Sequence, residues 1–298
     1  NNTAVGYHSL VANTTGNFNA AFGSSALSAN TTGIYNTAIG GQALRENTTA
    51  NNNTAVGLNA LLVNTTGQSN VAVGSSALDA CTTGNDNIAI GHNALTTSTN
   101  ASNNTAVGSA ALRFNTASNN TAFGRNTLGA NTTGSQNVAV GAFAFQANTT
   151  GNYNVAVGYN ALITNTTAER NTAIGQSALK LNTTGSYNVA VGELSLGANN
   201  GSDNTGCGHR TLQANTTGES LGILPKLVTS YMVVIVMMIG GYSLFDLVTD
   251  FRSTRIEAQQ RAEVTRGKLL RDLTKAKAAC EKASGGCGNQ PMSAKLFF

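Results

Sequence analysis

The stretches Asn-Thr-Ala-Val-Gly at 53–57 and Asn-Val-Ala-Val-Gly at 154–158 are two copies of the motif that decides the fold. The motif consists of Asn, a Thr or apolar residue, a small residue, an apolar residue and Gly, and it occurs thirteen times. Its closing glycines follow one another at intervals of 17 residues, apart from two intervals of 16. A repeat this short cannot bury its own apolar side chains and gains a core only by stacking on its neighbours. The sequence therefore predicts a solenoid.

The period indicates which kind of solenoid forms. Helical repeats need roughly 30 or more residues, whereas 17 suffice for two short strands and two turns per coil. Within 53–57, bulky and small residues alternate as in a strand, so Thr54 and Val56 point one way and Ala55 the other. A second apolar anchor, Leu or once Phe145, follows each closing glycine by four residues. The residues expected to be buried are Val56, Leu61, Val73, Leu78, Val157 and Leu162, and those expected to face outward are Ala55, Ala72 and Ala156.

Asparagine is the most regular feature of the repeat. The first Asn of the motif, as at Asn53 and Asn154, is never replaced, and in-register stacking predicts ladders of hydrogen-bonded amides. Gly57 and Gly158 close the same two copies, and we interpret all these repeat residues as structural. Between the anchors runs a polar turn, most often Asn-Thr-Thr-Gly. Asn-Thr-Thr occurs nine times and is an N-glycosylation acceptor, so a eukaryotic secretory pathway is expected to glycosylate these turns.

The repeat resembles a known family. Asn-Val-Ala-Val-Gly followed by a small residue and a second apolar position is similar to the head repeats of YadA-like trimeric autotransporter adhesins, and to repeats of phage and viral fibre proteins. The resemblance covers residues 1–218 and implies a left-handed parallel β-roll, three chains packed side by side, and attachment to host surfaces. Two features depart from the family: the period is longer, and no β-barrel anchor follows the repeats. Three rods packed along one face are expected to bury the outward alanines.

A different kind of anchor follows the repeats. Leu227–Phe245 contains 19 residues without a charge, between Lys226 and Asp246. At 1.5 Å per residue this length spans a hydrocarbon core of about 30 Å. Residues 1–218 hold six basic and six acidic residues, whereas 219–298 hold eleven and seven. Because most of that basic excess follows the apolar stretch, the positive-inside rule predicts the repeats outside and the C-terminus inside.

The domain organisation follows from these patterns. We expect an all-β parallel β-solenoid of about 13 coils at 1–218, forming a rod on the order of 60 Å long at about 4.8 Å per coil. The helix-favouring composition of 249–284 predicts a basic helix, which could form a short coiled coil or bind anionic lipid. The remaining boundaries are a linker at 219–226, a transmembrane helix at 227–248 and a flexible tail at 285–298.

No pattern in the chain indicates catalysis or metal binding. Cys81 takes the place of a turn Asn, and Cys207 takes an expected inward position as a small core residue, while Cys280 and Cys287 lie in the tail. The cysteines lack zinc-site spacing. The three histidines, and the six acidic residues of 1–218, are scattered over different coils. We therefore expect no catalytic, cofactor-binding or metal site, and no nucleic-acid partner, because acidic residues interleave the basic ones and no aromatic platform accompanies them.

Three non-enzymatic functions fit this sequence. The first is a membrane-anchored surface adhesin or attachment fibre, a homotrimer held in lipid through Leu227–Phe245 and displayed outside a cell or virion toward a host or matrix ligand. The second is a purely structural surface or appendage subunit. The third is ice binding by stacked pairs of turn threonines, although these threonines lie in turns rather than on a flat strand face.

Overall fold

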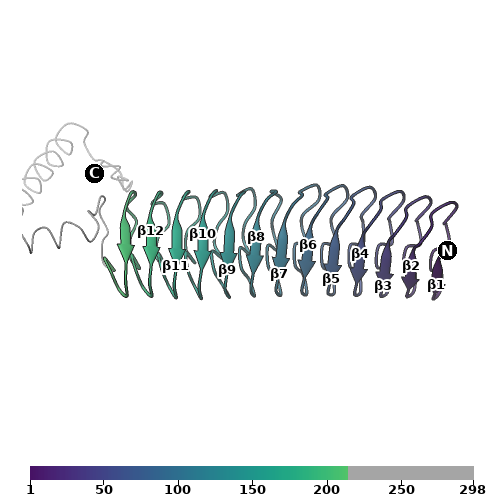
Figure 1. Cartoon of the computed structure of the whole chain (residues 1–298), viewed down its shortest axis with the longest axis horizontal. Coiled ribbons are helices and arrows are strands. Elements are labelled where there is room, and N and C mark those ends of the chain that lie inside the picture. Colours follow the sequence, from purple (N-terminus) through teal and green to yellow (C-terminus); the bar gives the residue numbers. More distant parts are fainter. Residues whose placement is uncertain (214–298) are drawn as a thin grey trace, which may run out of the picture. The chain divides into compact units, whose positions relative to one another are not determined.

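The computed structural model describes residues 1–213, which form a rod of stacked coils (Figure 1). Each coil contributes one strand of three residues and returns through turns to the start of the next strand. The strands are β1 (Thr3–Val5), β2 (Ala20–Phe22), β3 (Thr37–Ile39), β4 (Thr54–Val56), β5 (Val71–Val73), β6 (Ile88–Ile90), β7 (Thr105–Val107), β8 (Thr121–Phe123), β9 (Val138–Val140), β10 (Val155–Val157), β11 (Thr172–Ile174), β12 (Val189–Val191) and β13 (Thr205–Cys207).

The strands form a single parallel sheet along the rod. Its order is sequential from β1 to β13, so each new strand adds beside the previous one. The register follows the repeat, with Ala55 opposite Ala72 and Val56 opposite Val73. Coils of 16 residues keep this register, because Thr105 still pairs with Thr121. The predicted parallel β-solenoid is confirmed for the described residues.

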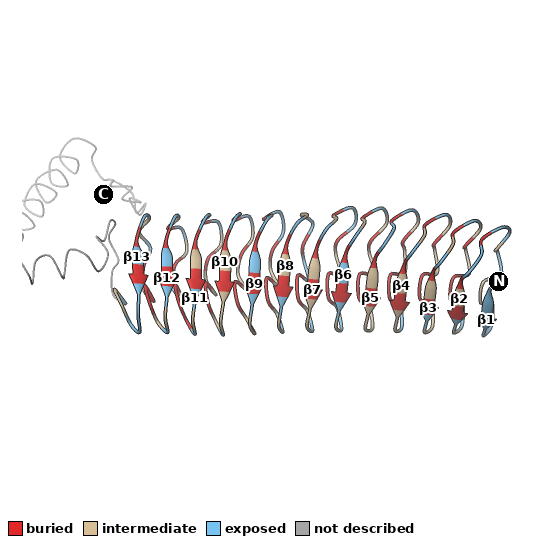
Figure 2. Cartoon of the chain, viewed as in Figure 1, coloured by how far each residue is buried: buried red, intermediate tan, exposed pale blue. Residues whose placement is uncertain are grey.

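The orientation that we predicted for the strands is wrong. Ala55, Ala72 and Ala156 are fully buried, whereas Val56 and Val157 stand outward and are only half-buried. Figure 2 shows buried (red) sections within the strands beside intermediate or exposed sections of the same strands. A coil of 17 residues brings its opposite walls so close that the interior beside the strand admits a methyl group and little more. Bulky β-branched residues therefore take the outer face of the sheet.

The interior of each coil is built from three apolar side chains and two amides. The anchor predictions hold, since Leu61, Leu78 and Leu162 are fully buried. They pack with the strand alanines and with a second alanine that directly precedes each anchor, such as Ala60. Where Thr127 replaces this second alanine, its hydroxyl donates to the carbonyl oxygen of Gly141 at 2.6 Å, so the buried polar group is satisfied.

Left-handed backbone recurs in every coil. Each anchor leucine has a positive φ, 52° at Leu61, as does the residue two places before it, 57° at Asn59. Such a conformation costs roughly 1–2 kcal/mol per non-glycine residue. Hydrogen bonds between coils offset this cost: Leu61 N–H donates to Ala77 O at 2.9 Å, and Asn59 N–H donates to Gly41 O at 3.0 Å. The backbone is therefore stable only within the stack.

The closing glycine of the motif has a steric cause. Gly57 has φ +135°, and a Cβ built there would lie 2.5 Å from the carbonyl oxygen of Gly74. No other residue fits that contact without moving the next coil. By contrast, the turn position occupied by Gly67 is Ala50 in the preceding coil, and neither residue has a positive φ.

Several predictions concern residues outside the described part of the chain. They are the linker at 219–226, the transmembrane helix at 227–248, the basic helix at 249–284 and the tail at 285–298. Among residues 1–213, the structure contains no helix that could cross a membrane.

Candidate interaction surface on the sheet

The outer face of the sheet is the most extended surface feature of the described residues. We call it the sheet face; it consists of the first and third residue of every strand, whose side chains point away from the core. The first residues are Thr3, Ala20, Thr37, Thr54, Val71, Ile88, Thr105, Thr121, Val138, Val155, Thr172, Val189 and Thr205. The third residues are Val5, Phe22, Ile39, Val56, Val73, Ile90, Val107, Phe123, Val140, Val157, Ile174, Val191 and Cys207.

The sheet face is uncharged along its whole length and largely apolar, with Thr at seven of its first positions. None of its positions on the thirteen described strands carries a charge. Its third residues remain open to solvent, with Ile39 42 % exposed and Val140 37 % exposed. Eleven of the 21 large hydrophobic residues found exposed in the described chain lie on this face. Cys207 also lies here and is exposed, which corrects its prediction as a core residue, because the buried residue of β13 is Gly206.

Aromatic and cationic side chains border the sheet face in two places. On the side preceding the strands, Arg170 lies between Tyr153 and Tyr187, with its guanidinium carbon 5.1 and 5.6 Å from their ring centres. On the side following them, Arg125 lies 4.7 Å from the ring centre of Phe143. These contacts hold flat side chains at the border by cation–π attraction. The side chains at these two borders extend the surface beyond the two ends of the strands.

The Asn ladder predicted from the motif is present behind the sheet. The backbone N–H of Asn53 donates to Asn36 Oδ1 at 3.0 Å, and Asn53 Nδ2 donates to Gly67 O at 2.8 Å. Asn154 bonds in the same way to Asn137 Oδ1 at 2.9 Å. The ladder asparagines at both positions are fully buried. Each amide therefore joins its own coil to a neighbour, and a residue of different shape would leave buried groups without partners.

A second ladder, missed from the sequence, is formed by the Asn of the Asn-Thr-Thr turn. Asn148 is fully buried, and its Nδ2 donates to Asn131 Oδ1 at 2.6 Å and to Gly151 O at 3.0 Å. The signal was available, because this Asn recurs at a fixed distance after the anchor Leu. We had interpreted the segment as a polar turn and so placed the amide outside. Seven of these asparagines are fully buried: Asn30, Asn47, Asn64, Asn131, Asn148, Asn165 and Asn182.

These buried amides oppose glycosylation of the turns once the rod has folded. A glycan replaces one hydrogen of Nδ2, and in Asn30 both hydrogens are used, toward Asn13 Oδ1 at 2.9 Å and Gly33 O at 3.1 Å. Neither the sugar nor the enzyme reaches a fully buried side chain in the folded rod. Of the nine turns, only the first, at Asn13, has a half-buried Asn, and the ninth, at Asn215, lies outside the described residues.

Cys81 and Ser98 interrupt the second ladder in adjacent coils. The thiol of Cys81 makes only a long contact of 3.6 Å to Gly84 O. Asn64 Oδ1, on one side of it, and Ser98 Oγ, on the other, are buried without a hydrogen-bond partner. Burial raises the pKa of the Cys81 thiol to about 11, so it is protonated at neutral pH. The two interrupted coils form one weak point in the ladder, and a second lies at Asn165 and Asn182, where Asn165 Nδ2 and Asn182 Oδ1 are buried without a hydrogen-bond partner.

The turn threonines have two different roles. The hydroxyl of the first Thr donates to the next coil, as from Thr31 Oγ1 to Thr48 O at 3.0 Å. The second Thr, such as Thr32 or Thr49, is exposed. In most pairs the first Thr therefore uses its hydroxyl in a hydrogen bond to the next coil. Only the second Thr of such a pair is left for the array considered for ice binding.

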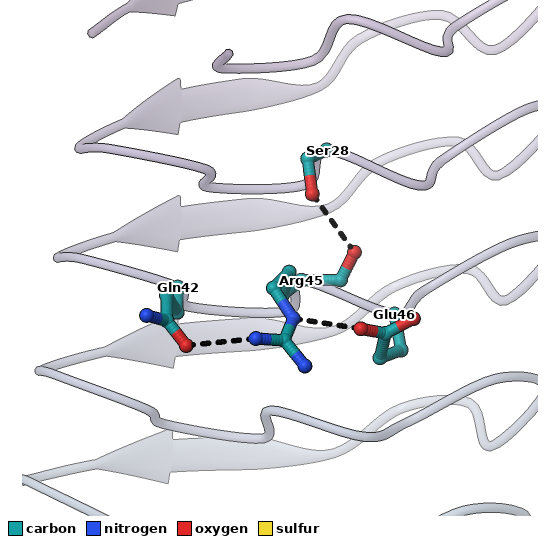
Figure 3. Close-up of polar contacts among 4 residues, drawn as sticks. All are labelled: Ser28, Gln42, Arg45 and Glu46. Carbon is teal, nitrogen blue, oxygen red and sulfur yellow. Dashed lines mark hydrogen bonds and ion pairs between the residues drawn. The ribbon is translucent and has the colours of Figure 1, made fainter. Parts of the chain in front are cut away.

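Charged residues of the described coils make local contacts only. Arg45 Nε donates to Glu46 Oε1 at 2.7 Å and Arg45 Nη1 to Gln42 Oε1 at 3.0 Å, while Ser28 Oγ donates to Arg45 O at 3.4 Å (Figure 3). His209 lies 3.8 Å from Glu193 at the surface. Within residues 1–213 there is no group of three or more His, Cys, Asp or Glu residues that could hold a metal.

Comparison with protein-family models, curated proteins and solved structures finds no match to this chain. The likeness to adhesin head repeats therefore rests on the motif, its regular repetition and the parallel β-solenoid.

Proposed function

We propose that this chain is a non-enzymatic surface adhesin or attachment fibre whose copies associate through the sheet face as a homotrimer. The observation that carries the proposal is an uncharged, largely apolar face that continues over thirteen in-register strands. Monomeric proteins seldom leave such a continuous apolar surface in water. The alanines that we expected between chains are inside each rod, so the contact is made instead by Thr, Val, Ile and Phe.

The free energy gained by covering the sheet face can be compared with the cost of association. Covering the remaining exposed two fifths of a Val or Ile side chain yields about 0.5–0.8 kcal/mol. Eleven such side chains on each of two facing rods then yield roughly 10–18 kcal/mol. Association costs about 4–15 kcal/mol in lost freedom. The gain exceeds the cost over most of these ranges when two faces are in contact along the whole rod, and falls short of it when the contact is confined to two or three coils.

The proposal also includes a membrane anchor. Leu227–Phe245, outside the described residues, would cross the membrane with the basic segment inside. A repetitive and nearly uncharged rod displayed outside would then project a ligand-binding or spacing element from the surface. The ligand would be a component of a host or matrix surface.

Substitutions on the two faces of β10 test the association. Val157→Asp places a charge on the sheet face without entering the core, so the rod should keep its circular dichroism and lose its oligomeric state. Ala156→Asp buries the charge and should unfold the neighbouring coils. Val157→Ile is the matched control, because Ile39 and Ile174 occupy equivalent positions. Sedimentation of the full chain in detergent distinguishes them; a monomeric parent protein, or a trimer unaffected by Val157→Asp, would refute association through this face.

Topology is tested separately by protease treatment of intact cells or virions. The proposal predicts removal of the repeats and protection of residues after about 250, because an uncharged stretch of this length satisfies its backbone as a helix in lipid. Protected repeats with a digested tail would contradict surface display, whatever the result of sedimentation.

The alternatives have less support from the described surface. A purely structural subunit would share the same rod and the same association, and only a binding screen against host surfaces separates it from an adhesin. Ice binding would have to use a single file of second threonines. Thermal hysteresis in the purified protein would favour it over both.

A further inference from the structure

A second set of acceptor sequences for N-linked glycans lies on the surface of the rod. Asn52, Asn103 and Asn119 each directly precede a ladder Asn and each begin the sequence Asn-Asn-Thr. The side chains of all three are exposed. Within the described residues, the structure shows no hydrogen bond from their side-chain amides, although the backbone N–H of Asn52 donates to Ile34 O at 3.1 Å. Their amides are therefore open while their backbone is held in place.

The turn acceptors and the surface acceptors differ in whether the Asn side chain is accessible. In both sets the Thr side chain points toward the outside of the rod. The Thr two places after the acceptor is exposed in the turns, as at Thr32, and half-buried but outward on the sheet face, as at Thr54. Both sets thus present the hydroxyl that defines the acceptor sequence. Only the surface set presents the nitrogen that must react.

We propose that Asn52, Asn103 and Asn119 are N-glycan acceptors of the folded chain, in a surface set that also includes the exposed acceptor sequences at Asn1, Asn100 and Asn200, and that its buried Asn-Thr-Thr turns are closed to this modification. The donor is a lipid-linked pyrophosphate oligosaccharide. Asn Nδ2 forms the new bond to C1 of the first sugar, the bond between C1 and the pyrophosphate oxygen breaks, and the lipid pyrophosphate leaves. Nδ2 gives up one proton to a base of the transferase.

The position of the acceptors has a structural consequence. Asn52, Asn103 and Asn119 lie in the row immediately before the strands, two residues ahead of Thr54, Thr105 or Thr121 on the sheet face. Glycans there would stand along one border of that face. They would hinder a second rod from approaching it, so glycosylation and association through the sheet face should oppose each other.

The experiment uses the full chain in detergent, a single-subunit oligosaccharyltransferase and a lipid-linked oligosaccharide, with occupancy of each site measured by mass spectrometry. Tryptic peptides of the same chain provide the unfolded reference. The Val157→Asp protein is assayed in parallel, so that a face covered by another copy is not mistaken for a closed site. The matched control variants are Thr54→Val, Thr105→Val and Thr121→Val, which remove the acceptor sequence and place the Val found at Val71 and Val155.

In the folded protein, occupancy at the surface acceptors should exceed that at Asn64, Asn131 and Asn148 by at least about tenfold, since a turn Asn reacts only after its coil opens. In the peptides the two sets should be glycosylated to similar extents. Each Thr→Val variant should lose glycan at its own site alone. Equal occupancy of both sets in the folded protein would overturn the proposal. So would the absence of glycan from the surface acceptors in both folded proteins when the peptides accept it.

Discussion

Restoring the interrupted Asn ladder should stabilise the rod. In Cys81→Asn, the new Nδ2 can donate to Asn64 Oδ1 and Gly84 O, as Asn148 Nδ2 donates to Asn131 Oδ1 and Gly151 O at 2.6 and 3.0 Å. Its Oδ1 then faces the next coil, where Ser98 Oγ has no partner. One substitution thus supplies partners to two buried groups that lack them.

The magnitude follows from those groups. A buried polar atom left without a hydrogen bond costs roughly 1–3 kcal/mol, and a made hydrogen bond contributes about 1 kcal/mol net. The loss of a buried thiol offsets about 1 kcal/mol of this gain. We expect Cys81→Asn to increase the local free energy of unfolding by about 1–2 kcal/mol.

Hydrogen exchange of the full chain is the suitable assay, because stability in a stacked repeat is local. Amides of the coils around Cys81 should exchange about tenfold more slowly, since 1.4 kcal/mol corresponds to a factor of ten. The reciprocal variant Asn148→Cys removes both donated bonds and should accelerate exchange in its own coils. Unchanged or faster exchange in Cys81→Asn, with normal behaviour of Asn148→Cys, would refute the reasoning.

Three further predictions concern single positions. The pKa of the Cys81 thiol is raised in the folded state, so its contribution to the free energy of unfolding should be complete below about pH 9 and be lost as pH rises toward about 11. Urea unfolding measured as a function of pH should show this loss, and Cys81→Asn should abolish it. Gly57→Ala should destabilise the rod by about 2–4 kcal/mol in urea, because the backbone is strained and the added methyl meets the Gly74 carbonyl. Asp86→Asn should leave the urea midpoint unchanged, because the exposed Asp86 makes no ion pair within the described residues.

The repeat predicts the fold class because a fixed period needs no knowledge of distant contacts. The interval between the closing glycines predicts the parallel register and the stacking of Asn53 on its equivalents. These features are local and repeated thirteen times, so each copy supports the same interpretation. The expectation of two strands per coil is wrong, because each described coil has one strand and returns through turns. Burial of the anchor Leu is predicted correctly, but regular recurrence alone does not explain it, because the Val, Ile or Phe that ends nearly every strand recurs as regularly and faces outward.

Which side of a strand faces the interior cannot be deduced from the repeat alone. Alternation shows that Val56 and Ala55 face opposite ways, but not which of them faces the interior. That choice depends on the width of the coil, which is set by left-handed residues such as Leu61 and by the turn amides inside. Hydrophobicity alone favours the larger residue inside, and here the thin interior excludes it. The second Asn ladder was missed because the same reasoning did not place turn amides in the thin interior.

Cross-linking of single cysteines most directly tests whether rods associate through an outward Val, Ile and Thr face. The background replaces the native cysteines by Cys81→Asn, Cys207→Val, Cys280→Ser and Cys287→Ser, and then carries either Val157→Cys or Ala156→Cys. With a short bis-maleimide, Val157→Cys should yield covalent oligomers of the full chain, and Ala156→Cys should remain unlabelled until the protein is unfolded. Labelling and cross-linking of Ala156→Cys, with Val157→Cys inert, would contradict both the orientation of the strands and the surface through which the rods meet.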